Sequence, residues 1–243
     1  MSLPHFFAGA PEPGERVVLR DSEARHALRS LRLTAGDRFT SSDGRGAIAT
    51  CVLVRTAGDE LEAEVETRDV AARPEPTLAV MVSAPKGERL TWAVQKLTEI
   101  GTDEIVVVET ARSVRRFRGD RARILTPRLE AVATEAAKQS RRAFLPVVSG
   151  PIPWEVAVRD ALSAGPTIVL WEAATAPLAE VLPDRAERVS LAIGPEGGLE
   201  EPEVRKAENK GAILGSLGRN ILRTETAAVV AAALALSRFG RLG

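Results

Sequence analysis

The sequence predicts an α/β protein in two parts: a small, mostly β module, then a larger domain built on a mostly parallel sheet. Short strand-like segments separated by turn signals fill residues 15–68. A stretch with two prolines, residues 71–77 (AARPEPT), then marks a change of pattern. Beyond it, continuous apolar runs alternate with helical patterns, as expected for parallel strands joined by crossover helices. We therefore divide the chain into domains of residues 1–73 and 77–243.

In the first domain the turn signals, such as Asp43-Gly44, separate four runs of strand-forming residues, and one helical piece is expected near residues 22–33. The strands are expected at residues 15–20, 38–44, 46–56 and 60–68. Cys51 lies in an apolar strand and is expected to be an inert core thiol.

In the second domain, residues 86–101 repeat apolar side chains at helical spacing and end at Gly101, a plausible C-cap. A second helix is expected over residues 126–140, and an alanine-rich helix closes the chain. Strands are expected at residues 77–84, 104–110, 167–171, 189–193 and near 212–214. Trp92 and Trp154 are expected in a core or an interface rather than in base stacking.

The composition excludes several classes of protein. With 44% hydrophobic and 27% charged residues, the chain of 243 residues is ordinary for a globular protein. One cysteine excludes an internal disulfide, and one cysteine with two histidines cannot form the usual structural zinc cluster. The longest apolar run, residues 227–236, is too short to span a bilayer, and the N-terminus does not resemble a signal peptide. We expect a cytoplasmic protein without a metal or a membrane partner.

The charges balance at 33 basic and 33 acidic residues, but arginines are clustered. Residues 112–128 contain seven arginines and only one acid, Asp120. Arg25, Arg29 and Arg32 follow spacings of four and three, which place them on one helix face. These clusters could be two solvated faces; guanidinium groups also match phosphate geometry, so two clusters favour a polyanionic partner.

The loop GPEGG, residues 194–198, follows a buried strand and precedes a helix. It is therefore expected at the carboxyl edge of the sheet, where open α/β folds bind ligands, and its glycines permit close approach of the backbone. Acidic residues at 200–203 disfavour a phosphate at the start of that helix, and the common phosphate-loop motifs are absent. A plain connection without a ligand remains the alternative.

A second glycine-containing loop leads into the last helix, for which Thr224 is the expected N-cap and Glu225 suits the first turn. Together, IGPEGGL (193–199) and LGRNILRTETAA (217–228) resemble the 16S ribosomal RNA uracil-N3 methyltransferase family of the SPOUT superfamily. Further matching pieces occur in the family's order along nearly the whole chain, at residues 26–37, 86–101, 109–114 and 135–146.

This resemblance implies a PUA-like RNA-binding barrel at the N-terminus and a C-terminal domain with a trefoil knot, a rare exception to unknotted connections. It also implies a homodimer that uses S-adenosyl-L-methionine to methylate N3 of a specific uridine in the decoding region of 16S rRNA, in the small ribosomal subunit. Glu200 departs from the family pattern, which favours a small residue there, and is expected to weaken the cap of the following helix.

By the same resemblance, three stretches of chain are expected to line the cofactor pocket. Adenine can be held there by backbone groups between apolar side chains. The expected residues are Leu170, Glu172, Gly194, Glu196, Gly197, Gly198, Leu217, Gly218, Ile221 and Leu222.

The methyl group on a sulfonium is already activated, so the enzyme must align it with N3 and assist removal of the imide proton. Arg223 is the candidate for holding the uracil or stabilising its developing negative oxygen. The alternative is that Arg223 pairs with Glu196 or Glu225 and braces the loops. Glu196 is expected to brace its loop, with direct proton abstraction as the alternative.

N3 lies on the Watson–Crick edge, so the target uridine must be unpaired or flipped out. With 4% aromatic residues, shape and phosphate contacts should dominate over base stacking. The candidate RNA contacts are Arg29, Arg32, Lys86, Arg112, Arg115, Arg116 and Arg142. Two other functions remain open: a non-catalytic RNA-binding assembly factor, and a small-molecule α/β enzyme that uses the glycine loops for another nucleotide.

Overall fold

The computed structural model describes residues 3–85, 88–113 and 119–242. The chain forms two compact units, residues 1–73 with 137–145, and residues 74–136 with 146–243. The segment 137–145 lies within the second domain in the sequence-based division, yet it groups with the N-terminal residues in the structure. Within the first unit, the N–H of Gly46 donates to the carbonyl oxygen of Ala143 at 3.0 Å.

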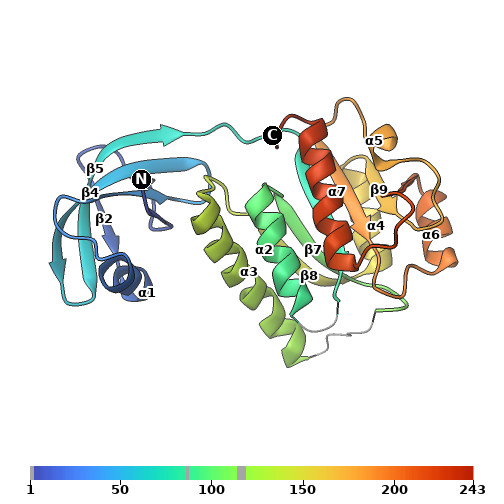
Figure 1. The fold of residues 1–243 in the computed structure, drawn as a ribbon, viewed down its shortest axis with the longest axis horizontal. Helices are drawn as coiled ribbons and strands as arrows, with labels where there is room; N and C mark the ends of the chain where they lie inside the picture. Colours follow the sequence, from blue (N-terminus) through green and yellow to red (C-terminus); the bar gives the residue numbers. More distant parts are fainter. Residues whose placement is uncertain (1–2, 86–87, 114–118, 243) are drawn as a thin grey trace. The chain divides into compact units, whose positions relative to one another are not determined.

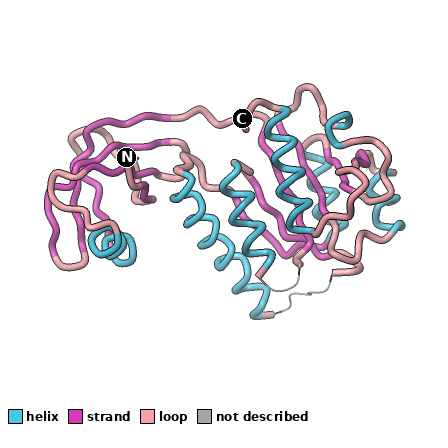
Figure 2. Tube along the Cα trace, viewed as in Figure 1, coloured by secondary structure: helices cyan, strands magenta, loops and turns pink. Residues whose placement is uncertain are grey.

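The first unit contains a five-stranded sheet in the order β1-β3-β4-β5-β2 (Figures 1 and 2). All neighbouring strands are antiparallel except β1 and β3. The strands are β1 (His5–Phe6), β2 (Arg16–Leu19), β3 (Arg38–Ser42), β4 (Ala47–Ala57) and β5 (Glu60–Val70). Between β2 and β3, α1 (Asp21–Arg25) continues into a π-helix, η1 (His26–Ser30). The four predicted strands and the helical piece are confirmed, whereas a closed barrel stays a prediction.

Cys51 lies in the core of this sheet with the fully buried aromatic side chains of Phe6 and Phe39. Burial, with the nearby charge of Glu66, raises the pKa of the Cys51 thiol to about 11. Because the thiolate is the reactive form, the thiol is unreactive at neutral pH, as the sequence predicts.

The second unit contains a six-stranded parallel sheet in the order β11-β9-β10-β6-β7-β8 (Figure 1). Its strands are β6 (Thr77–Ser83), β7 (Glu104–Glu109), β8 (Val147–Pro153), β9 (Thr167–Leu170), β10 (Arg188–Ile193) and β11 (Ile213–Gly215). Its helices are α2 (Arg89–Ile100), α3 (Asp120–Ser140), α4 (Trp154–Ala164), α5 (Leu178–Val181), α6 (Glu201–Glu208) and α7 (Thr224–Arg238). The parallel sheet is thereby confirmed.

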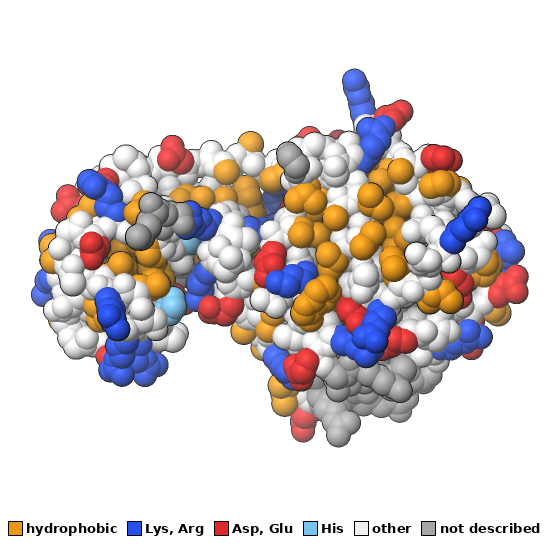
Figure 3. Space-filling view, in the orientation of Figure 1, with side chains coloured by type: hydrophobic (Ala, Val, Ile, Leu, Met, Phe, Trp, Pro, Cys, Tyr) orange, Lys and Arg blue, Asp and Glu red, His pale blue; other side chains and the backbone are white. Residues whose placement is uncertain are grey.

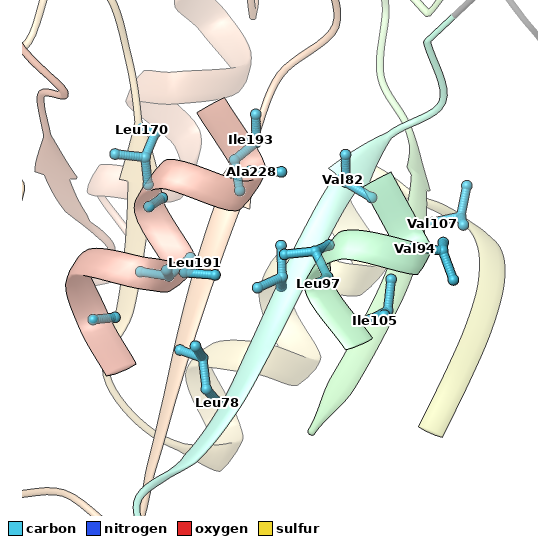
Figure 4. Close-up of a cluster of buried hydrophobic side chains, with 14 of the residues drawn as sticks. Leu78, Val82, Val94, Leu97, Ile105, Val107, Leu170, Leu191, Ile193 and Ala228 are labelled. Carbon is cyan, nitrogen blue, oxygen red and sulfur yellow. The ribbon is translucent and has the colours of Figure 1, made fainter. Parts of the chain in front are cut away.

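Helices cover both faces of this sheet, as its two separate apolar clusters show. One cluster joins the sheet to α2, α3, α5 and α7, and the other joins it to α4 and α6. In Figure 4, Val94 of α2 lies beside Val107 of β7, and Ala228 of α7 lies beside Ile193 of β10. The alanine face of α7 is buried in this core, where small side chains let the helix approach β6 and β10 closely.

Three differences from the sequence predictions concern the second unit. Helix α3 begins at Asp120 rather than near residue 126 and contains Pro127. Strand β8 and helices α4 and α5 were not predicted; in β8, two prolines and a glycine interrupt the apolar pattern at the edge of the sheet. Trp154 is buried in the core, as expected; Trp92 is 43% exposed on α2 and so is not a core residue, and its place in an interface stays a prediction. No helix in the described part of the chain is long and apolar enough to cross a membrane.

The end of the chain is fixed by a buried ion pair between Arg241 and Asp103, whose side chains are 10% and 7% exposed. The Arg241 guanidinium donates to both carboxylate oxygens, at 2.6 and 3.0 Å, and also to the carbonyl oxygens of Pro76 and Gly101. The Asp103 carboxylate in turn accepts from the N–H of Leu78 at 2.8 Å. This network joins the residues after α7 to the start of β6 and the end of α2.

Arg241→Ala should lower the free energy of unfolding by about 3 kcal/mol, because it leaves the buried Asp103 carboxylate without its countercharge. Urea unfolding measures this change. The matched control is Arg238→Ala, which removes an ion pair to Asp184, 90% exposed, and should cost less than about 1 kcal/mol. Equal losses for the two variants would contradict the structural role of the Arg241 network.

Candidate functional site

A cavity of about 310 Å³ lies where β9, β10 and β11 end. Leu170, the last residue of β9, pairs with Ile193 of β10 and with Gly215 of β11, so the three strands end at the same level. The loops that follow them therefore begin side by side and form the walls of the cavity.

All ten residues predicted to hold a cofactor line this one cavity. They are Leu170, Glu172, Gly194, Glu196, Gly197, Gly198, Leu217, Gly218, Ile221 and Leu222. The sequence analysis did not name the other residues that line it, which include Trp171, Arg219 and Asn220. Trp171 lies between the predicted Leu170 and Glu172, and Arg219 and Asn220 lie within the second glycine motif, so their place in the chain is the sequence signal that could have identified them.

Two glycines of the GPEGG loop, Gly194 and Gly198, are required by its geometry. Gly198 has a φ of +72°, and its N–H donates to the Pro195 carbonyl oxygen at 2.9 Å, which closes a tight turn. A Cβ atom on Gly198 would lie 2.7 Å from the Glu172 carboxylate oxygen. A Cβ atom on Gly194 would lie 2.8 Å from the Leu199 side chain. The loop therefore lies too close to its surroundings for larger residues.

The prediction that Thr224 caps α7 is wrong. Arg223 occupies the N-cap position, and its side chain forms no capping hydrogen bond. Thr224 is the first helical residue, and its hydroxyl donates to the Gly194 carbonyl oxygen at 3.1 Å. The hydroxyl thus satisfies a backbone group of a different loop and joins the first turn of α7 to the GPEGG loop.

The prediction that Glu200 weakens the cap of α6 is also wrong. Glu200 is itself the N-cap and forms a capping box with Glu203. The Glu203 carboxylate accepts from the N–H of Glu200 at 3.0 Å and from the N–H of Ala111 at 2.8 Å. It therefore connects the GPEGG loop to the segment that follows β7.

Arg112 belongs to that same segment and holds the GPEGG loop from outside the cavity. Its guanidinium donates to the Gly197 carbonyl oxygen at 3.0 Å and lies 3.5 Å from the Glu200 carboxylate. These contacts give Arg112 a role in shaping the loop; its RNA contact stays a prediction.

The sequence analysis offered Arg223 as a possible ion-pair partner of Glu196 or Glu225, but the structure shows a different arginine in this place. Both carboxylates lie 3.5 Å from the guanidinium of Arg89, the first residue of α2. Arg223 is exposed, and within the described parts of the chain its side chain forms no ion pair or hydrogen bond. The alternative in which Arg223 braces the loops is therefore not what the structure shows. The sequence analysis missed Arg89, because its partners are more than a hundred residues away.

The remaining RNA-contact candidates are distributed over several segments. Arg29 is exposed, with its guanidinium 3.6 Å from the Asp59 carboxylate. Arg32 follows the π-helix, is exposed and has a φ of +57°. Arg142 lies partly buried after α3. Lys86, Arg115 and Arg116 lie outside the described residues.

Comparison with known proteins shows which family shares these features. The model of the RNA methyltransferase domain matches residues 73–236, and that of the RNA methyltransferase PUA domain matches residues 19–66. The chain belongs to the RNA methyltransferase family. This result confirms the resemblance seen in the glycine motifs and the PUA-like identity of the N-terminal module.

Relatives of this RNA methyltransferase cover nearly its whole length. Ribosomal RNA small subunit methyltransferase E of Mycobacterium tuberculosis is 34% identical over 91% of this chain and 86% of its own length. The Bacillus subtilis protein of the same name is 29% identical over 90% and 89%.

Solved structures show the same fold. The Neisseria gonorrhoeae ribosomal RNA small subunit methyltransferase E, bound to S-adenosyl methionine, has a TM-score of 0.88 and 26% identity, over 97% of this chain and 98% of its own. A probable rRNA-methyltransferase from Porphyromonas gingivalis has a TM-score of 0.84 and 32% identity, over 98% and 99%.

Gly198→Ala should lower the free energy of unfolding by about 1–2 kcal/mol, the cost of a side chain in the left-handed conformation. The new Cβ would also displace Glu172. Gly197→Ala is the matched control, because a Cβ there meets only Arg112, at an ordinary 3.7 Å. Urea unfolding of both variants is the measurement, and an equal effect at the two neighbouring positions would refute the geometry described for the loop.

Proposed function

We propose that this protein is an S-adenosylmethionine-dependent methyltransferase that methylates N3 of a specific uridine in the decoding region of 16S rRNA. The single observation that carries the proposal is the convergence of the predicted cofactor residues, from three separate loops, on one cavity. The cofactor-bound relative with the same fold supports the same choice of ligand. The name shared by the curated relatives supports a small-subunit rRNA substrate.

The chemistry of the cavity suits this cofactor. Leu170, Ile193 and Leu217 offer apolar surface for adenine, and the glycines expose backbone groups that can hydrogen-bond its edge. Among the described residues that line the cavity, the charged side chains are those of Glu172, Glu196 and Arg219. Their formal charge is negative overall, whereas the cofactor, with its sulfonium, ammonium and carboxylate groups, is positive overall. The lining therefore favours the positively charged methyl donor mainly through Glu172, because Glu196 is already paired with Arg89.

When bound, the cofactor supplies a methyl group activated by its sulfonium. The protein must then orient the uracil and stabilise the negative charge that its oxygens gain as N3 loses a proton. Arg223 is the candidate for this role because its side chain is exposed and its neighbours in the chain, Leu222 and Thr224, line the cavity, whereas Arg223 itself does not line it. Glu196 is held by Arg89 and so acts as a brace, while proton abstraction by Glu196 remains the alternative.

The RNA should meet the helical side of the first unit rather than the exposed face of β5. On β5, the carboxylates of Glu60, Glu62 and Glu66 pair with arginines, so that this face is neutralised. Arg32, after the π-helix, is exposed and available for phosphates, and Arg29 forms only a 3.6 Å ion pair with the exposed Asp59, which a phosphate can replace. The other proposed contacts are Lys86, Arg112, Arg115, Arg116 and Arg142.

We also propose that the enzyme is a cytoplasmic homodimer and that its chain is knotted. Figure 3 shows hydrophobic side chains gathered on the face that carries α2 and α7, where Trp92 and Leu234 are 43% and 44% exposed. Such a surface suits a second copy of the chain. In support of the knot, residues 216–223 lead from the edge strand β11, past the ends of β9 and β10, to a helix packed on β6 and β10.

Transfer of a labelled methyl group from S-adenosylmethionine to small-subunit rRNA tests this proposal. The wild-type protein should label one uridine at N3, and Arg223→Ala should lower turnover at least about a hundredfold, as expected for loss of a group that stabilises developing charge. Cofactor binding by Arg223→Ala should remain measurable. Arg238→Ala, at the far end of the same helix, is the control and should transfer methyl groups normally.

Near-normal turnover by Arg223→Ala would remove Arg223 from the mechanism. Cofactor binding by the wild type without any methyl transfer would instead support a non-catalytic RNA-binding factor.

A further inference from the structure

Arg89 connects two segments that lie far apart in the sequence. Its guanidinium Nη1 lies 3.5 Å from a carboxylate oxygen of Glu196, in the loop after β10. Its Nε lies 3.5 Å from a carboxylate oxygen of Glu225, in the first turn of α7. Both contacts are ion pairs rather than hydrogen bonds, so it is the positive charge of the guanidinium that attracts the two carboxylates to one place.

The Glu225 carboxylate is buried and depends on the ion pair with Arg89. Glu225 is only 7% exposed, and its second carboxylate oxygen is buried without a hydrogen-bond partner among the described residues. A buried carboxylate depends strongly on a nearby positive charge. The ion pair with Arg89 therefore stabilises the position of the first turn of α7.

The two connected segments both form part of the cavity wall. Gly194 to Leu199 line it from the loop after β10, and Ser216 to Leu222, with Thr224, line it from the stretch that enters α7. Besides Arg89, the Thr224 hydroxyl joins the same two segments at Gly194. Arg89 itself does not line the cavity, so its effect on a bound ligand must pass through these walls.

We propose that Arg89 is a positioning residue for methyl transfer, which holds the two cofactor-binding segments in register through Glu196 and Glu225. This inference rests on the proposed function, because it assumes that the cavity binds S-adenosylmethionine. Arg89, at the start of α2, lies outside both glycine motifs, so the inference adds a residue that these motifs do not include.

Isothermal titration calorimetry on the full-length protein, with S-adenosylmethionine and with 5′-methylthioadenosine, tests the proposal. The second ligand keeps the adenosine but lacks the amino-acid group. Arg89→Ala should raise the dissociation constants of both ligands about tenfold, because it leaves the buried Glu225 carboxylate without a nearby positive charge and frees the two segments from each other. Arg89→Lys should restore part of the affinity, since an ammonium keeps the charge but lacks the planar fork.

The matched control is Arg128→Ala. Arg128 forms an ion pair of 2.6 Å with Glu88, the residue before Arg89, and both side chains are exposed. This pair lies at the same helix start, but no hydrogen bond or ion pair joins it to the cavity wall within the described residues, so its loss should leave both dissociation constants unchanged.

A double variant separates positioning from stability. Arg89→Ala leaves a buried charge on Glu225, and the further change Glu225→Gln removes that charge. The double variant should recover the melting temperature of the cofactor-free protein. It should not recover the ligand affinity, because no ion pair joins the GPEGG loop to the first turn of α7. If affinity returns together with stability, Arg89 is merely structural and the proposal is wrong. If Arg89→Ala does not fold, Arg89→Lys and the double variant provide the same comparison.

Two further outcomes are decisive. If the wild type binds neither ligand, the proposed function fails. If the wild type binds both and Arg89→Ala weakens neither, or weakens only S-adenosylmethionine, the positioning role fails, because selective loss would indicate direct contact with the amino-acid group.

Discussion

The hydrogen bond from the Thr224 hydroxyl to the Gly194 carbonyl oxygen joins the last helix of the chain to the loop after β10. The shape of the cavity depends on hydrogen bonds between loops, because its walls come from loops that are distant in sequence and contain several glycines. Parallel pairing brings the ends of β9, β10 and β11 to one level, but it does not determine the shape of the loops beyond them. That shape follows from long-range hydrogen bonds and ion pairs.

Charged side chains stabilise the cavity loops in the second unit and form surface ion pairs in the first unit. Around the cavity, Arg89 and Arg112 hold the GPEGG loop from two segments, and Glu203 attaches the end of the same loop to the residues after β7. In the first unit, arginines and glutamates neutralise one another along β5, whereas Arg29 and Arg32 beside the π-helix are exposed. A protein with balanced total charge can thus still present a basic surface to a polyanion.

Much of the fold could be predicted from the sequence, because apolar runs and helical spacing are local signals and turn residues interrupt them. Strand β8 was missed since its prolines and glycine hide it. The cavity residues were predicted from the two glycine motifs, whose geometry depends on neighbouring residues. The contacts that hold these motifs in place could not be predicted. In the sequence Thr224 resembles a helix cap, but in the fold its hydroxyl binds Gly194. Arg89 resembles any other charged residue at a helix start, but in the fold it pairs with Glu196 and Glu225. Pairing across such separations has no local signature.

The central claim is that the cavity positions a methyl donor for transfer to N3 of a uridine in the small-subunit rRNA. Mass spectrometry of nucleosides from 16S rRNA, isolated from cells with and without the gene, tests it most directly. N3-methyluridine should be present in the first sample, absent from the second and restored by the wild-type gene. An unchanged level of N3-methyluridine after deletion would contradict the claim.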